Sequence, residues 1–62
     1  MKYSELKRKL QKAGCLLKRE GAGHEVWFSP LTGKNFFVGR HDKEEVAIGT
    51  LKNISKSSGV KL

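Results

Sequence analysis

Two tight turns constrain the fold of this chain more than any other feature of its sequence. Gly21-Ala22-Gly23 and Pro30-Leu31-Thr32-Gly33 separate three short segments rich in apolar and aromatic residues. Glycine reaches positive φ without steric cost, and proline presets φ at the start of a turn. Connections this short join neighbouring antiparallel strands, so the three segments predict a meander. We expect strands over residues 15–20, 24–29 and 35–38.

A helical segment is predicted on each side of this meander. Before it, apolar residues at helical spacing predict a helix over about residues 3–13, with Ser4 as the N-cap. After it, a second helix is predicted over 50–58, with Gly49 or Thr50 as its cap. The predicted fold is therefore α+β in the order α-β-β-β-α, a three-stranded antiparallel sheet with two helices on one face. We interpret residues 1–62 as a single domain with a small core.

The pattern leaves open which face of the sheet the helices cover. Alternate residues of the central strand form two sets, one on each face: His24, Val26 and Phe28, and Glu25, Trp27 and Ser29. Because Glu25 and Ser29 are polar, we expect Val26 and Phe28 to point into the core. Trp27 would then lie on the open face, where it either stacks on a base or a partner or simply packs.

The charge of the chain favours an anionic partner. Its 13 Lys and Arg outnumber 6 Asp and Glu, which gives a formal net charge of +7. Such a balance suits nucleic acid, an acidic protein or both, with a solvated surface as the plain alternative. Because the chain has no long apolar run and no signal segment, we expect no membrane association and a cytoplasmic location. Cys15, the one cysteine, has no disulfide partner and is expected in the core.

Two histidines and several cations provide the chemistry of a candidate site. RNA is cleaved without metal when a base activates the 2′-hydroxyl and cations stabilise the added charge on the phosphate. His24, which follows the first turn, is the candidate for proton transfer, although on spacing alone a histidine beside a glycine turn is more often structural. No cluster of metal ligands is visible, and no cofactor is expected. The candidate RNA- and phosphate-binding residues are Gly21, Gly23, Lys18, Arg19, Lys34, Arg40, His41 and Trp27.

Three segments occur in an order that is specific when they are taken together. They are Gly21-Ala22-Gly23-His24-Glu25-Val26-Trp27, Val38-Gly39-Arg40-His41 and Glu45-Val46-Ala47-Ile48-Gly49-Thr50-Leu51-Lys52-Asn53-Ile54. With the N-terminal helix, this set covers nearly the whole chain and resembles the HicA family of toxins. The chain departs from the family pattern at two positions. Gly23 stands where serine is common, and Gly39 stands where proline is frequent.

The resemblance implies a fold similar to double-stranded-RNA-binding domains and a ribonuclease that acts on mRNA, with His24 at the active site. The lack of a metal-ligand pattern in the sequence predicts that this ribonuclease is metal-independent. It also implies a HicB-like antitoxin that covers this site, in an oligomeric toxin–antitoxin complex. Two non-enzymatic alternatives remain: a double-stranded-RNA-binding module without cleavage, and a basic domain that binds an acidic protein. For RNA binding we expect strong salt dependence and weak sequence selectivity.

Overall fold

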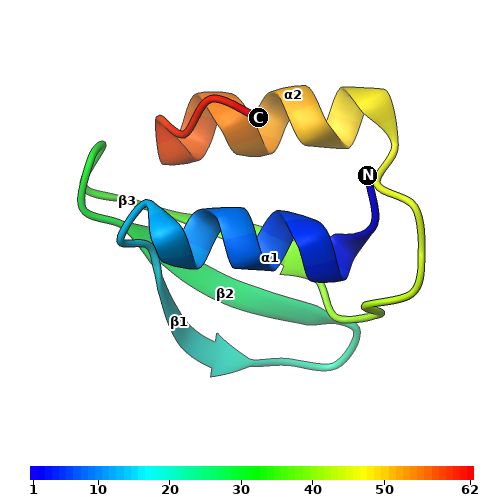
Figure 1. The fold of residues 1–62 in the computed structure, drawn as a ribbon. Coiled ribbons are helices and arrows are strands. Elements are labelled where there is room, and N and C mark those ends of the chain that lie inside the picture. Colours follow the sequence, from blue (N-terminus) through cyan, green and yellow to red (C-terminus); the bar gives the residue numbers. More distant parts are fainter.

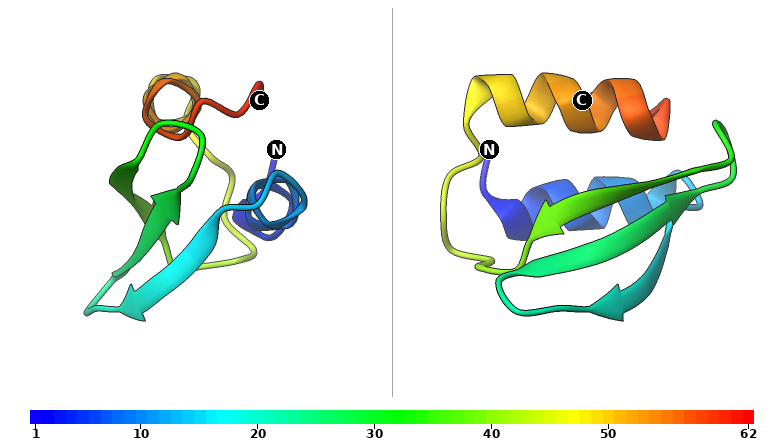
Figure 2. Two further views of the ribbon diagram at one scale, coloured as in Figure 1. Left: turned by 90° about the vertical axis from the view of Figure 1, so that its left-hand side faces the viewer. Right: turned by 180° about the vertical axis from the view of Figure 1, so that it is seen from behind.

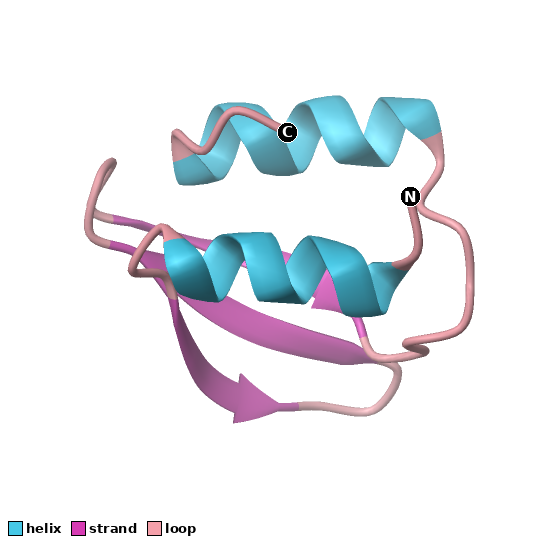
Figure 3. Ribbon diagram, viewed as in Figure 1, coloured by secondary structure: helices cyan, strands magenta, loops and turns pink.

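A computed structural model describes residues 1–62 and gives the predicted order of elements (Figures 1 and 3). The elements are α1 (Tyr3–Lys12), β1 (Leu16–Glu20), β2 (His24–Ser29), β3 (Lys34–Gly39) and α2 (Ile48–Ser58). The α+β class and the order α-β-β-β-α are thereby confirmed. The predicted bounds of the central strand are correct, and those of the other elements differ by one or two residues.

The three strands form one antiparallel sheet in the order β1-β2-β3, with β2 in the centre. Both helices lie on the same side of this sheet, side by side (Figure 2). The pairing of β1 with β2 is irregular between Leu17 and Arg19, which leaves Lys18 as an extra residue. Because of this bulge, the consecutive residues Lys18 and Arg19 both lie on the uncovered face of the sheet. Arg19 pairs with Val26 there, and the Lys18 Nζ lies 5.8 Å from the centre of the Phe28 ring.

The expectation about the two faces of the sheet is wrong. Trp27 points toward the helices and is only 1% exposed, in a core shared with Leu6 and Leu10 of α1 and Ile54 of α2. The remaining buried apolar residues are Cys15, Phe36, Val38 and Val46. Burial of Cys15 is confirmed. Because Trp27 is enclosed in this core, it is not available to stack on a base.

The two polar residues that suggested the opposite orientation have partners inside the protein. The Ser29 hydroxyl donates a hydrogen bond to the carbonyl oxygen of Ser58 at the end of α2. Glu25 accepts hydrogen bonds from the Trp27 Nε1, at 3.0 Å, and from the Lys7 Nζ, at 3.1 Å. A buried polar group with partners avoids most of its desolvation cost, whereas exposing an indole forfeits a large apolar contribution. The orientation with Trp27 inside is therefore the stable one.

Neither helix begins at the predicted cap. The N-caps are Lys2 and Ala47, and neither makes a side-chain capping bond. Backbone contacts replace the missing caps at the start of α1. The Tyr3 N–H donates to the Glu44 carbonyl at 3.0 Å, and the Ser4 N–H donates to the Asp42 carbonyl at 3.1 Å. The backbone N–H groups in the first turn of α1 are thus satisfied by carbonyls of the β3–α2 connection. This partner is distant in the chain, so the local sequence does not reveal it.

Candidate functional site

His24 stands at the start of β2 with its side chain on the uncovered face of the sheet. The turn before it is closed by a 2.7 Å hydrogen bond from the Gly21 N–H to the His24 carbonyl. Gly23 has a φ of +84°, a conformation that L side chains rarely adopt. The glycine turn therefore fixes where β2 begins, and His24 is the first side chain that it presents to solvent.

Phe37 of β3 is the aromatic neighbour of His24. Its ring meets the imidazole edge to face, with 6.4 Å between centroids and 72° between planes. Phe37 is 68% exposed, although it follows the buried Phe36. The sequence does not single out Phe37, because a Phe-Phe pair does not indicate which ring faces outward. Its cross-strand pairing with Val26, which the structure supplies, places it on the His24 side.

A shallow concavity of about 530 Å³, here called the sheet hollow, adjoins His24 on the uncovered face. Its lining residues come from all three strands and from the glycine turn: Arg19, Glu20, Gly21, Ala22, His24, Val26 and Phe37. Of the predicted phosphate ligands, the structure thus brings Arg19 and Gly21 together with His24. Lys18 lies on the same face, over Phe28. The sheet hollow thus brings the Arg19 guanidinium and the His24 imidazole together beside the glycine turn, with the Glu20 carboxylate also in its lining.

The other predicted cations lie at different distances from His24. His24 pairs with Gly39, so Arg40 follows the cross-strand neighbour of His24 directly, and its side chain is exposed. His41, also exposed, lies one residue further along. Lys34 pairs with Ser29 at the opposite end of β3. At about 3.3 Å per strand residue, Lys34 lies roughly 17 Å from the His24 level, so it does not belong to this site.

An ion network beneath His24 joins α1 to the loop that carries Arg40. The Lys7 Nζ bonds to Glu25 at 3.1 Å, to Asp42 and to the Arg40 carbonyl at 3.4 Å. Burial by itself lowers the pKa of Lys7, but the hydrogen bonds and charges of Asp42 and Glu25 outweigh it and raise that pKa above its ordinary value. Lys7 is therefore held in an internal ion network and is not free to bind an external anion. Its spacing of four residues from Tyr3 and three from Leu10 was the available signal.

Replacing Lys7 with Met is expected to lower the free energy of unfolding by about 1–3 kcal/mol near neutral pH, because Glu25 then keeps no cationic partner. The pKa of Lys7 is raised on folding, so its contribution is fully present below the ordinary value of 10.5. It is lost as the pH rises through the higher folded value. In urea titrations from pH 8 to 11, the free energies of unfolding of the wild type and of Lys7→Met should therefore converge. Lys12→Met, on the exposed surface of the same helix, is the control. A gap between wild type and Lys7→Met that stays constant through pH 11 would contradict this role.

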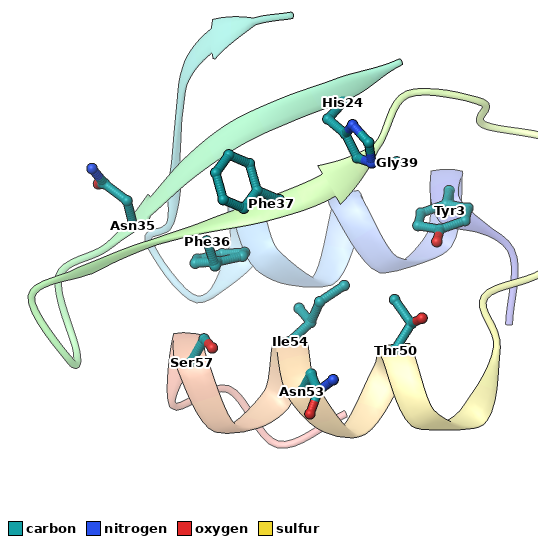
Figure 4. Close-up of a pocket in the computed structure, with 10 residues that line it drawn as sticks. All are labelled: Tyr3, His24, Asn35, Phe36, Phe37, Gly39, Thr50, Asn53, Ile54 and Ser57. Carbon is teal, nitrogen blue, oxygen red and sulfur yellow. The ribbon is translucent and has the colours of Figure 1, made fainter. Parts of the chain in front are cut away.

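A second concavity of about 460 Å³, here called the β3–α2 groove, lies between those two elements (Figure 4). His24 and Phe37 line it, so His24 borders both concavities. The groove also contains neutral hydrogen-bonding side chains that no sequence motif singled out: Asn35, Thr50, Asn53 and Ser57. Thr50, Asn53 and Ser57 follow helical spacing, a signal that has meaning only once β3 is known to lie alongside them.

Comparison with known proteins gives one match. A family model described as the HicA toxin of bacterial toxin–antitoxin systems matches residues 3–60 of the chain. No curated protein and no solved structure matches it. Neither helix has the length and apolar character needed to cross a membrane. No group of three or more His, Cys, Asp and Glu side chains is arranged to hold a metal ion.

Proposed function

Because the chain belongs to the HicA toxin family of bacterial toxin–antitoxin systems, we propose that it is an endoribonuclease that cleaves mRNA with His24 as the proton-transfer group. The observation that carries this proposal is the exposed His24 at the glycine turn, beside Arg19 in the sheet hollow. An imidazole can exchange protons near neutral pH, and a guanidinium suits the oxygens of a phosphate. Metal-free RNA cleavage requires these two groups together.

In the proposed reaction, His24 accepts the proton of a ribose 2′-hydroxyl as its oxygen attacks the adjacent phosphorus. The bond from phosphorus to the 5′-oxygen breaks, which leaves a 2′,3′-cyclic phosphate on one fragment and a 5′-hydroxyl on the other. Solvent supplies the proton for the leaving oxygen, because His24 lies at an open surface. Arg19 and the N–H groups of Ala22 and Gly23, which donate no hydrogen bond within the chain, stabilise the charge that builds on the phosphate.

Arg40 is proposed to hold a neighbouring phosphate of the same strand. Its position directly after the residue paired with His24 puts it at the same end of the sheet. Lys7 acts on Arg40 only indirectly, by anchoring the carbonyl of this residue to α1. His41 is a secondary phosphate ligand in this scheme. Lys34 and Trp27 have no part in it, because the former lies at the far end of β3 and the latter is enclosed in the core.

Pure protein is expected to cut single-stranded mRNA at low salt in the presence of EDTA. The reason is that the proposed mechanism uses only side chains and backbone of the chain, and no ligand cluster for a metal is present. The fragments should carry 2′,3′-cyclic phosphate ends, which are recognised by gel mobility because phosphatase removes their phosphate only after acid has opened the ring. Loss of cutting on chelation, with recovery on adding magnesium, would reject the metal-free mechanism. RNA that is bound but never cut would favour the non-catalytic alternative.

A toxin–antitoxin family implies an antitoxin partner, and we propose that a HicB-like protein binds over the uncovered sheet face. This face presents Phe37 and Leu16, which are 68% and 60% exposed, next to Arg19 and Lys18. Exposed apolar residues rimmed by cations suit an acidic partner with a central apolar contact. Phe37 takes the anchoring role that was expected of Trp27. Such a partner would exclude RNA from His24 by occupying the same surface.

Phe37→Ala is expected to weaken antitoxin binding by roughly tenfold or more, as truncation of a central aromatic contact does. Ile48→Ala is the matched control, because Ile48 is also largely exposed, at 74%, but lies on α2. Binding is measured by titration calorimetry, and hydrogen exchange of the complex locates the surface. Protection confined to the outer helix surfaces, with His24 still able to cut RNA in the complex, would contradict this placement.

A further inference from the structure

The β3–α2 groove differs in chemical character from the rest of this basic protein. None of the ten residues that line it is Lys, Arg, Asp or Glu, although 31% of the chain is charged. The sheet hollow, by contrast, contains Arg19 and Glu20. A concavity without charged walls is a poor site for a phosphate or for the carboxylates of an acidic partner. It suits a neutral group instead.

The neutral polar side chains of the groove are free to bind a ligand. Thr50, Asn53 and Ser57 lie at positions i, i+3 and i+7, along one side of α2. Neither they nor the Asn35 side chain takes part in any side-chain hydrogen bond of the chain. An asparagine amide offers a donor and an acceptor next to each other. This is the arrangement with which proteins read the edge of a nucleobase.

The size and the aromatic wall of the groove fit the same ligand. Its volume of about 460 Å³ falls within the range of roughly 300–1,000 Å³ that small-molecule sites occupy. Phe37 stands at the rim beside His24, with much of its ring exposed (Figure 4). Exposed aromatic rings in single-strand-binding proteins serve as stacking surfaces for bases. The groove thus offers both a stacking surface and hydrogen-bonding groups for a base edge.

We propose that the β3–α2 groove binds an unpaired nucleobase next to the phosphate held in the sheet hollow, and that Asn53 reads the edge of that base. The inference rests on the proposed function, since it assigns a subsite for the same RNA. Because His24 lines both concavities, a strand that crosses it places its phosphate on the cationic side and its base on the neutral side. A base within a duplex is stacked and paired, so the substrate is single-stranded at this position. The preference of the protein for particular RNA sequences is then stronger than binding to phosphate charge alone would give.

The test measures binding of four homopolymeric ten-nucleotide strands with 2′-fluoro riboses, which lack the nucleophile and stay uncut. The wild-type protein is expected to bind one base at least about fivefold more tightly than the weakest, since a single amide–base pair discriminates to this degree. Asn53→Ala should reduce this preference to within about twofold. Gln11→Ala removes an exposed amide outside the groove and should preserve the preference. A duplex of complementary strands should show no dependence on Asn53.

The outcomes separate this inference from the proposed activity. Equal binding of all four bases by wild type, or identical behaviour of Asn53→Ala and Gln11→Ala, overturns the base subsite even if RNA is cut. A base preference lost in Asn53→Ala supports the subsite even if no cutting occurs. If Asn53→Ala weakens antitoxin binding and leaves the base preference intact, the groove is a protein site and the inference fails. Thr50→Val, which keeps the shape of that side chain, serves as a second variant if Asn53→Ala does not fold.

Discussion

His24→Ala is expected to reduce RNA cleavage by about 10²–10⁴-fold, the usual contribution of a proton-transfer group. Growth arrest on induced expression should disappear with it. His24 makes no side-chain hydrogen bond within the chain, and its principal aromatic neighbour is Phe37. Losing that contact costs about 1 kcal/mol or less. The variant should therefore accumulate as folded protein, so that loss of toxicity reports on chemistry and not on abundance.

Two comparison variants sharpen this prediction. His24→Gln keeps polarity and bulk but cannot transfer protons near neutral pH, so it should be as inactive as the alanine variant. His41→Ala removes the other exposed imidazole and should cost less than about tenfold, as a secondary phosphate contact would. Cleavage is measured on a defined RNA at matched protein concentration, and folding by circular dichroism. A fully toxic His24→Ala protein at wild-type levels would show that His24 is not the proton-transfer group.

Trp27→Ala is expected to remove much of the stability of the protein. Removing a large buried aromatic side chain typically costs about 3–5 kcal/mol. A chain of this length has roughly 3–9 kcal/mol of stability in total, at 0.05–0.15 kcal/mol per residue. The loss also leaves the Glu25 Oε1 without the Trp27 Nε1 donor. Urea unfolding followed by circular dichroism should show a transition shifted close to zero denaturant.

Phe37→Ala separates this structural role from ligand binding. Phe37 is an aromatic residue of the next strand with an exposed ring, and its removal should change stability by about 1 kcal/mol or less while weakening RNA binding. In the wild-type protein, Trp27 is the only tryptophan, so acrylamide quenching of its fluorescence reports directly on its exposure. Strong quenching that RNA suppresses, together with a stable Trp27→Ala protein, would place Trp27 on the ligand face after all.

The strands and the candidate histidine could be predicted because their signals are local. The glycine turn before His24 and the proline-containing loop after Ser29 mark both ends of β2, and these bounds are correct. The position of Gly21 beside His24 follows from the same hairpin, whereas Arg19 lies there because of the bulge at Lys18, which the sequence did not predict. Helix caps were predicted less well, because the start of α1 is satisfied by backbone carbonyls from the β3–α2 connection and not by the Ser4 side chain. No local pattern carries that information.

By itself, the sequence determined the order of the elements, the antiparallel meander and the place of His24 directly after the glycine turn, since these depend on turn chemistry and short-range spacing. Only the tertiary structure decided which face of the sheet is buried. Side chains along a strand alternate between the two faces of the sheet, and this alternation does not tell which face is buried. The buried face depends on whether distant segments supply partners for its polar side chains. Lys7 from α1 neutralises Glu25, and the Ser58 carbonyl from α2 accepts the hydroxyl of Ser29. With these two polar side chains satisfied, burying Trp27 becomes the lower free energy, and Phe37 remains at the surface beside His24.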